Sequence, residues 1–440
     1  MLTRRDFVRC GVLAGSGTLA LVAGCAGRSS PAAPGQVVRG KGDEVRSLVA
    51  RAAGDPVRAR GVAAALQAFT ADLYRLLPRS DRNLVCSPYS VAVALAMTRT
   101  GARGRTAAEM DRVLHAPALE QLNSGLGAED ALLEKRSRTV RRADGSTAKV
   151  ELHVATSLWG QRGVAWRSAF LDALARSYGV GMRLVDYRKP EAARLRINAW
   201  TSDQTHGKID DLIPEDALTE LTRLVLVNAL YLKAPWEHPF DTSRTHALPF
   251  IRTDGSTVTV PTMRTEIHGA RYARGRGWEA AELRYAGNEL AMTVILPDRG
   301  TLQALQTDLD GDQLAEILRA PVPVSALDLQ LPKWTFRTAS SLNDALAELG
   351  MPTAFDRRTA DFAGITSDEQ LCISQVMHEA FVAVDEAGTE AAAATAIGIS
   401  VASAEPLPVS MVVDRPFLFV IHDLPTAIPL FIGRTTDPSA

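Results

Sequence analysis

One stretch decides how this chain folds: Val384-Asp-Glu-Ala-Gly-Thr-Glu-Ala-Ala-Ala-Ala-Thr-Ala-Ile-Gly-Ile-Ser-Val-Ala-Ser403. It follows a strand-like segment at residues 374–384 and has no bulky apolar side chain between residues 386 and 396. Side chains alternate between two faces in a strand, so Thr389, Ala391, Ala393 and Thr395 share an uncharged face of small residues. Such a segment is able to enter a sheet with that face buried. A short surface helix is the alternative, because alanine favours helix, but two isolated turns are marginal in water.

The same residues resemble a known functional segment. Glu386, the triplet Gly388-Thr389-Glu390 and the run Ala391-Ala392-Ala393-Ala394-Thr395 are similar to the hinge of the reactive-centre loop of inhibitory serpins. Insertion of that loop into a sheet is an established property of the family. The residues by themselves indicate only a small-residue segment that is able to become a strand.

Further motifs extend the resemblance over about residues 61–437. They are, in chain order, Asn83-Leu-Val-Cys-Ser-Pro-Tyr-Ser90, Ile197-Asn-Ala-Trp-Thr-Ser-Asp-Gln-Thr-His-Gly-Lys-Ile209, Trp236-Glu-His-Pro-Phe240, Asp414-Arg-Pro-Phe-Leu-Phe-Val-Ile421 and Ile428-Pro-Leu-Phe-Ile-Gly-Arg434. Pro88 suits the first turn of a helix, and Thr106 with Glu109 has the spacing of a capping box. The resemblance implies a mixed α/β serpin fold with three β-sheets, about nine helices and an exposed reactive-centre loop.

The resemblance also implies a polar cluster that controls opening of the main sheet. Its members are Ser87, Ser90, Asn228 and His378, and Trp236 matches the tryptophan at the end of the sheet where insertion begins. From the residues alone, His378 is a hydrogen-bonded core histidine, since it alternates with apolar residues. Trp236 is equally well explained as a large core aromatic.

The first 60 residues are a leader and a tether rather than part of the fold. Residues 1–25 contain the twin-arginine motif Thr3-Arg-Arg-Asp-Phe-Val-Arg9 and an apolar run, residues 12–23, that is too short to span a bilayer. Cys25 ends a string similar to a bacterial lipobox and is the expected lipidation site. Residues 26–60 form a flexible linker and N-terminal tether, and residues 61–437 form the serpin domain. We expect an exported cell-envelope lipoprotein, or an extracellular protein if the leader is cleaved and the chain released.

Composition and motifs exclude several function classes. The 440 residues carry a formal net charge of -1, which implies no nucleic-acid partner. The densest basic run, residues 135–142, is expected to be a solvated helix end and turn. No Gly-x-Ser-x-Gly, P-loop or His-Glu-x-x-His motif occurs, and the eight histidines are dispersed. We therefore expect neither an enzyme nor a cofactor or metal.

The function that the resemblance implies is irreversible suicide inhibition of a serine protease by a monomer. The protease attacks the loop and forms an acyl-enzyme, and the cleaved loop then inserts as a strand. The family's spacing from Glu386 places the reactive bond at Ala402–Ser403, and a small residue there fits elastase-like or subtilisin-like proteases. Two alternatives remain: a non-inhibitory serpin, which predicts bulky, charged or proline residues in the hinge, and a cysteine-protease inhibitor on the same fold.

Overall fold

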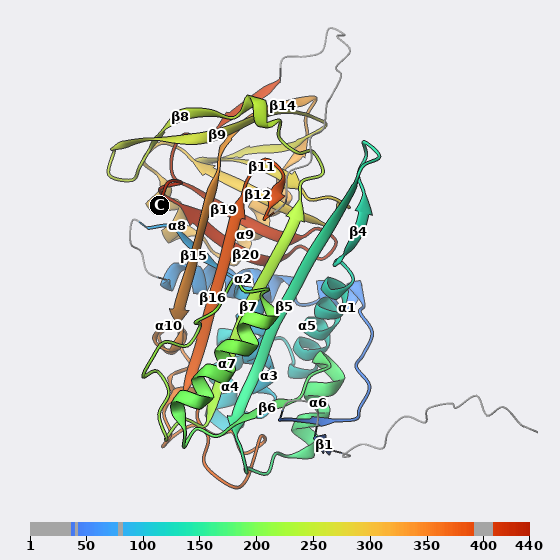
Figure 1. The fold of residues 1–440 in the computed structure, drawn as a ribbon, viewed down its shortest axis with the longest axis vertical. Helices are drawn as coiled ribbons and strands as arrows, with labels where there is room; N and C mark the ends of the chain where they lie inside the picture. Colours follow the sequence, from blue (N-terminus) through green and yellow to red (C-terminus); the bar gives the residue numbers. More distant parts are fainter. Residues whose placement is uncertain (1–36, 40–42, 78–81, 391–407) are drawn as a thin grey trace, which may run out of the picture. The chain divides into compact units, whose positions relative to one another are not determined.

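Three β-sheets and ten α-helices make up the part of the chain that the structure, a computed structural model, describes: residues 37–39, 43–77, 82–390 and 408–440 (Figure 1). All of these residues belong to one compact unit, and residues 44–47 and 56–60 form a strand and a helix of it, so the expectation of a flexible tether over residues 26–60 is wrong for this part. The mixed α/β architecture and the three sheets confirm the fold that the resemblance implies. Cys25, Ala391 to Ala394, Thr395, Ala402 and Ser403 lie outside the described residues. Among the helices that are described, none is long and apolar enough to cross a membrane.

The largest sheet has nine strands. In spatial order eight of them are β1 (Val37–Arg39), β2 (Glu44–Ser47), β6 (Met182–Val185), β5 (Thr147–Gln161), β7 (Leu224–Pro235), β17 (Gly388–Thr389), β16 (Gln375–Val384) and β15 (Trp334–Ser341). The ninth, β4 (Arg138–Arg141), pairs with β5. The long central strands β5, β7 and β16 run side by side in Figure 1, and the two-residue strand β17 lies between β7 and β16.

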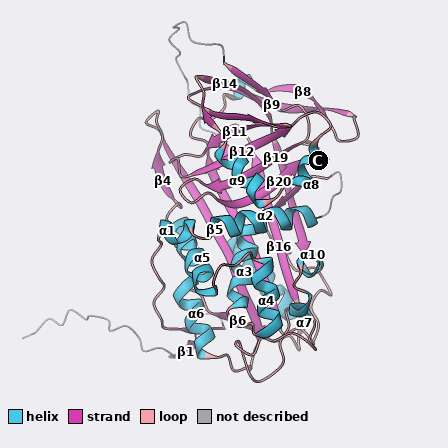
Figure 2. Ribbon diagram, turned by 180° about the vertical axis from the view of Figure 1, so that it is seen from behind, coloured by secondary structure: helices cyan, strands magenta, loops and turns pink. Residues whose placement is uncertain are grey.

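Strand β7 is apolar apart from Asn228 and Lys233, as expected of a strand in a sheet that is covered on both faces. In front lies α7 (Pro190–Gln204), whose Ile197 packs with Val225 and Val227 in a small separate core (Figure 1). Behind the sheet lie α3 (Pro88–Arg99) and α5 (Leu119–Glu134), and there Leu226 and Leu230 belong to the main core (Figure 2). Alternate residues of one strand therefore enter two different cores.

The second sheet has seven strands and the third has four among the described residues. The second contains β13 (Val322–Pro323), β10 (Arg271–Gly275), β11 (Trp278–Arg284), β12 (Leu290–Pro297), β19 (Phe417–Asp423), β20 (Ile428–Thr435) and β3 (Leu84–Cys86), in that order. The third contains β18 (Val409–Val412), β14 (Ala326–Pro332), β9 (Thr257–His268) and β8 (His246–Ile251). The C-terminal hairpin β19–β20 thus lies inside the second sheet, between β12 and a strand from near the start of the fold.

The remaining helices are α1 (Pro56–Arg60), α2 (Ala63–Leu76), α4 (Gly104–Val113), α6 (Ser168–Tyr178), α8 (Leu302–Asp308), α9 (Gly311–Arg319) and α10 (Asn343–Leu349), with 3-10 turns at Thr242–Arg244 and Pro352–Phe355. Of the two helix starts predicted from capping signals, one is correct and one is wrong. Ser87 caps α3, with Pro88 in its first turn, as expected. The predicted capping box is wrong: α4 begins at Gly104, and Glu109 instead accepts hydrogen bonds from Thr353.

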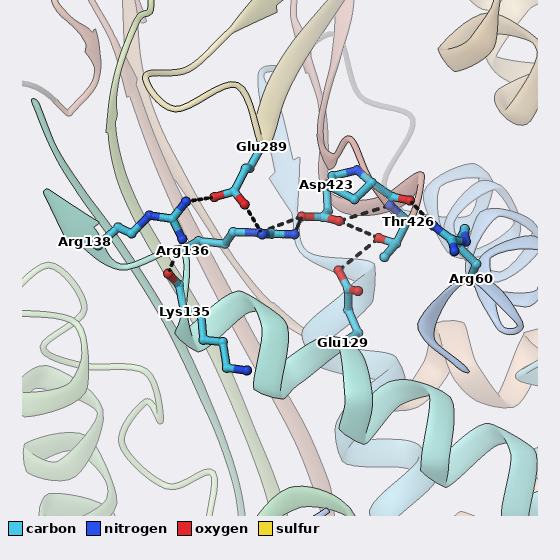
Figure 3. Close-up of polar contacts among 9 residues, drawn as sticks. Arg60, Glu129, Lys135, Arg136, Arg138, Glu289, Asp423 and Thr426 are labelled. Atoms are coloured by element: carbon cyan, nitrogen blue, oxygen red, sulfur yellow. Dashed lines mark hydrogen bonds and ion pairs between the residues drawn. The ribbon is translucent and has the colours of Figure 1, made fainter. Parts of the chain in front are cut away.

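Two arginines of the basic run are buried, so the expectation of a solvated helix end and turn is wrong for them. Arg136 is buried between Asp423, 2.9 Å from its Nη2, and Glu289, 2.5 Å from its Nη1 (Figure 3). Arg142 is also buried and donates from Nε to the carbonyl of Trp236 at 2.9 Å. A buried guanidinium needs partners, and these partners come from distant parts of the chain.

Candidate functional site

The large sheet is forked at one end, where β7 and β16 separate. Lower down the two strands pair directly and in parallel, from Val225 with Gln375 to Leu230 with Ala380. At the fork β17 lies between them, with Thr389 opposite Val384 on one side and Ala234 on the other. Strand β17 is antiparallel to both neighbours. The hinge predicted from the sequence therefore already occupies the first position of a strand that would separate β7 from β16.

A tight turn brings the chain back from β16 into β17. The Asp385 N–H donates to the Gly388 carbonyl at 3.0 Å, and the Asp385 Oδ1 accepts from the Ala387 N–H at 2.8 Å. Gly388 has φ +152°, and a Cβ there would lie 2.3 Å from the Ala234 carbonyl oxygen. Only glycine fits this close approach of two backbones.

Thr389 is buried against two aromatic rings. Its hydroxyl lies 2.7 Å from the Tyr285 hydroxyl, and the Tyr285 ring stacks on Trp236 at 4.6 Å. The Trp236 indole N–H donates to the Asp385 carbonyl at 3.0 Å, and the Trp236 backbone N–H donates to the Ala387 carbonyl at 2.9 Å. Trp236 is therefore both a core aromatic and a direct contact of the hinge, which combines the two explanations that the sequence left open.

Two ion pairs hold the glutamates on either side of Thr389. Glu386 accepts from Lys333 Nζ at 2.8 Å and from the Thr245 hydroxyl at 2.7 Å. Burial acts to raise the pKa of Glu386, but these two hydrogen bonds outweigh it and lower the pKa. Glu390 pairs with Lys208 at 2.5 Å, and its N–H donates to the Ala383 carbonyl at 2.8 Å. Lys208 lies in the loop after α7, so the hinge is fixed from both faces of the sheet.

The predicted polar cluster is assembled beneath the sheet. Asn228 of β7 lies opposite His378 of β16, and both side chains face α3. The Ser87 N–H donates to His378 Nε2 at 3.0 Å, and the Ser90 hydroxyl donates to the Ser87 carbonyl at 3.0 Å. Thr156 of β5 lies opposite Asn228 on its other side. All four predicted members therefore meet where β7 and β16 still pair directly, below the fork.

Not every buried polar atom of the cluster has a hydrogen-bond partner among the described residues. Asn228 Nδ2 lies 3.4 Å from the Met377 carbonyl. Asn228 Oδ1 and His378 Nδ1 are buried and have no hydrogen-bond partner among the described residues. Burial lowers the pKa of His378 to about 4, so the ring is neutral at pH 7, and Nε2 is free to accept the Ser87 N–H. Unpaired buried polar atoms are rare and call for an explanation.

Four residues of the site were not predicted from the sequence: Thr156, Lys208, Tyr285 and Lys333. Each makes its contact across a long stretch of chain, as Lys333 does with Glu386 and Tyr285 with Thr389. Lys208 lies inside the family-like string of residues 197–209, but nothing in that string marks it as a partner of the hinge. For Thr156 the available signal is the alternation of residues 148–159, which places it on the same face as Leu152 and Leu158.

Comparisons with known proteins agree with this geometry. The profile of the family described as Serpin (serine protease inhibitor) matches residues 64–438. An uncharacterized serpin-like protein of Thermococcus kodakarensis is 37% identical over 377 residues, 85% of each chain. The leukocyte elastase inhibitor of Equus caballus is 33% identical, covering 84% of this chain and 97% of the relative. The native crystal structure of the thermophilic serpin tengpin superposes with a TM-score of 0.77 at 25% identity, covering 88% of this chain and 97% of its own.

Proposed function

Because the chain belongs to the serpin family, whose general activity is protease inhibition, we propose that it is an irreversible suicide-substrate inhibitor of serine proteases. The protease's serine attacks the reactive bond and forms an acyl-enzyme, and the new carboxyl end of the loop stays esterified to the enzyme. The loop then inserts between β7 and β16 and carries the protease with it before deacylation.

The observation that carries this proposal is the position of Thr389 between the two separated strands. Continuing the register into an inserted strand would place Ala391 opposite Leu232 and Val382, and Ala393 opposite Leu230 and Ala380. All four partners belong to the main core, so side chains placed between them by insertion would be buried. The uncharged small-residue face of the hinge is therefore the face that insertion would bury.

The same register brings Thr395 between Asn228 and His378. A hydroxyl both donates and accepts, so Thr395 would partner the two buried atoms that now lack one, Asn228 Oδ1 and His378 Nδ1. Insertion would separate β7 from β16 at Asn228 and His378. The one pairing between these two strands would be replaced by two pairings, one on each side of the inserted loop. The polar cluster would thus act as a gate that is better satisfied when open than when closed.

The length of the loop is sufficient for this transfer. Residues Gly388 to Ala402 number fifteen, and at about 3.4 Å per residue they give roughly 50 Å of strand. A small residue at Ala402 would leave a trypsin-like pocket with an unpaired carboxylate and a chymotrypsin-like pocket largely empty. We propose targets of the elastase or subtilisin type, and the similarity to a leukocyte elastase inhibitor is in keeping with this choice.

Formation of a covalent complex tests the mechanism. The full chain, mixed with elastase or subtilisin, should give a band at the summed mass on a denaturing gel. Thr389→Arg should be cleaved without forming that band, because insertion would bury an unpaired charge at a cost of about several kcal/mol. Thr389→Ser, which keeps a small hydroxyl, is the matched control and should trap protease as the parent does.

Other outcomes of these experiments would refute the insertion register, support an alternative function or move the reactive bond. Trapping by Thr389→Arg at the parent stoichiometry would refute insertion in this register. A parent that forms no complex with serine proteases supports a non-inhibitory serpin, and a complex with papain-type enzymes alone supports the cysteine-protease alternative. Mass spectrometry of the released fragment should show a new N-terminus at Ser403. A start at Ala402 or Ala404 shifts the bond by one residue, and cleavage near Arg415 overturns the specificity.

We further propose that the mature protein is attached to the cell envelope through a lipid on Cys25. The support is the sequence of the leader alone, in which the cysteine follows a twin-arginine motif and a short apolar run. No cofactor has a role in the proposed mechanism, and the inhibitor would act as a monomer on its target protease.

A further inference from the structure

Three metal-binding side chains gather on the front face of the large sheet. Glu151 and His153 are two residues apart on β5 and so point the same way. His206 lies in the turn after α7 with φ +53°. One potential ligand atom from each of the three lies within 4.8 Å of the other two. The His153 and His206 rings meet edge to face at 5.1 Å, and Tyr231 of β7 packs against both at 6.1 and 5.3 Å.

The donor set has the chemistry of an open zinc site. Two imidazoles and one carboxylate are a common set of three protein ligands for zinc, with water in the fourth position. In such a tetrahedron the ligand atoms lie about 3.4 Å apart, so a modest rotation of two exposed histidines and one half-buried glutamate brings them together.

One neighbour competes for the carboxylate. Lys149 pairs with Glu151 at 3.1 Å, and the lysine is mostly exposed. A surface ion pair of this kind contributes little, so the ammonium group is free to move into solvent when a divalent cation takes its place. The opposite residue in the strand register, Lys233, is half-buried and forms no ion pair with Glu151 among the interactions of the described residues.

We propose that Glu151, His153 and His206 form a zinc site that fastens the loop after α7 to strand β5. The fastened loop carries Lys208, two residues beyond His206, and Lys208 holds Glu390 of the hinge. Glu390 has φ +52° and has to become extended before β17 can lengthen, so zinc would restrain this change through Lys208. This regulatory consequence rests on the proposed function, whereas zinc binding itself does not.

Calorimetric titration of the full chain with zinc chloride tests the site. The parent should bind one zinc ion. His153→Gln and His206→Asn should each weaken binding about tenfold or more, and asparagine at position 206 tolerates the positive φ. His246→Gln, on the exposed surface of β8, is the control and should bind as the parent does. Absence of binding, binding unchanged in both ligand variants, or binding that excess magnesium abolishes would each overturn the site.

Two further measurements distinguish zinc binding from its proposed effect on protease trapping. Zinc should raise the thermal midpoint of the parent and of His246→Gln but not of His206→Asn, whose own midpoint without zinc shows that it is folded. Zinc should also slow formation of the protease complex by the parent and leave His206→Asn unaffected. Binding without a change in trapping rate overturns the regulatory role alone. If no protease is trapped under any condition, the calorimetry still decides whether the site exists.

Discussion

The imidazole of His378 is a buried titratable group at the point where β7 and β16 must part. Its Nε2 accepts the Ser87 N–H, so the ring cannot be protonated there without losing that hydrogen bond. The pKa of His378 is lowered to about 4 in the folded protein, against about 6.5 in an unfolded chain. The stabilising effect of a lowered pKa is complete above the unfolded value and is lost as pH falls toward the folded value.

Acidification should therefore weaken the fold through His378. Between pH 7.5 and pH 5 this group alone should remove about 2 kcal/mol from the free energy of unfolding. His378→Gln lacks the titration and should show a shallower decline over the same range, measured by urea unfolding at several pH values. His246→Gln, at an exposed position of β8, is the control for replacing a histidine with glutamine. Parallel slopes for His378→Gln and the parent would contradict the assignment.

At the scale of one element, the β16–β17 hairpin depends on Gly388. Alanine there would meet the Ala234 carbonyl at 2.3 Å and would also adopt a positive φ. Strain of this kind costs about 1–3 kcal/mol, which is enough to move the hinge out of the sheet. Gly388→Ala should therefore be cut after Glu390 by a glutamate-specific protease roughly tenfold faster than the parent. Mass spectrometry of the fragments identifies the cut.

A second glycine variant is the control for placing an alanine at a positive φ elsewhere in the chain. Gly255 lies in the turn between β8 and β9 with φ +82°, and an added Cβ would meet nothing within 4 Å. Gly255→Ala carries the strain without the collision and should leave cleavage after Glu390 unchanged. Equal rates for Gly388→Ala and the parent would mean that the hinge does not rest between β7 and β16 in solution.

The elements also show how far the sequence alone leads. The start of α3 at Pro88 and the strand β16 were predicted correctly, because capping and alternation are local properties. Arg136 and Arg142 were misplaced on the surface because a dense basic run is judged by its neighbours in sequence. Their partners are Asp423, Glu289 and the Trp236 carbonyl, which only the fold brings near. The zinc ligands were missed for the same reason, since His206 is far in sequence from Glu151 and His153.

At the scale of the whole molecule, the proposed lipid on Cys25 predicts where the protein is found. Cys25→Ala should move the protein from the membrane fraction to the soluble fraction, because the proposed lipid is then lost. Cys10→Ala, which changes the other cysteine of the leader, should stay with the membranes. Fractionation followed by immunoblotting measures both. Membrane association of Cys25→Ala would indicate an uncleaved anchor in place of a lipid.

The position of the C-terminal hairpin also determines the order in which the second sheet is able to form. Strands β19 and β20 are synthesised after β12 and long after β3, yet they lie between these two strands in the second sheet, where Ile432 pairs with Cys86. Strand β3 has to wait for a partner that is made much later. Contacts that span so much of the chain form slowly and leave strand edges unpaired in the meantime. Newly made chains therefore complete this sheet only after β20 has been made, and until then the edge of β3 is open to aggregation.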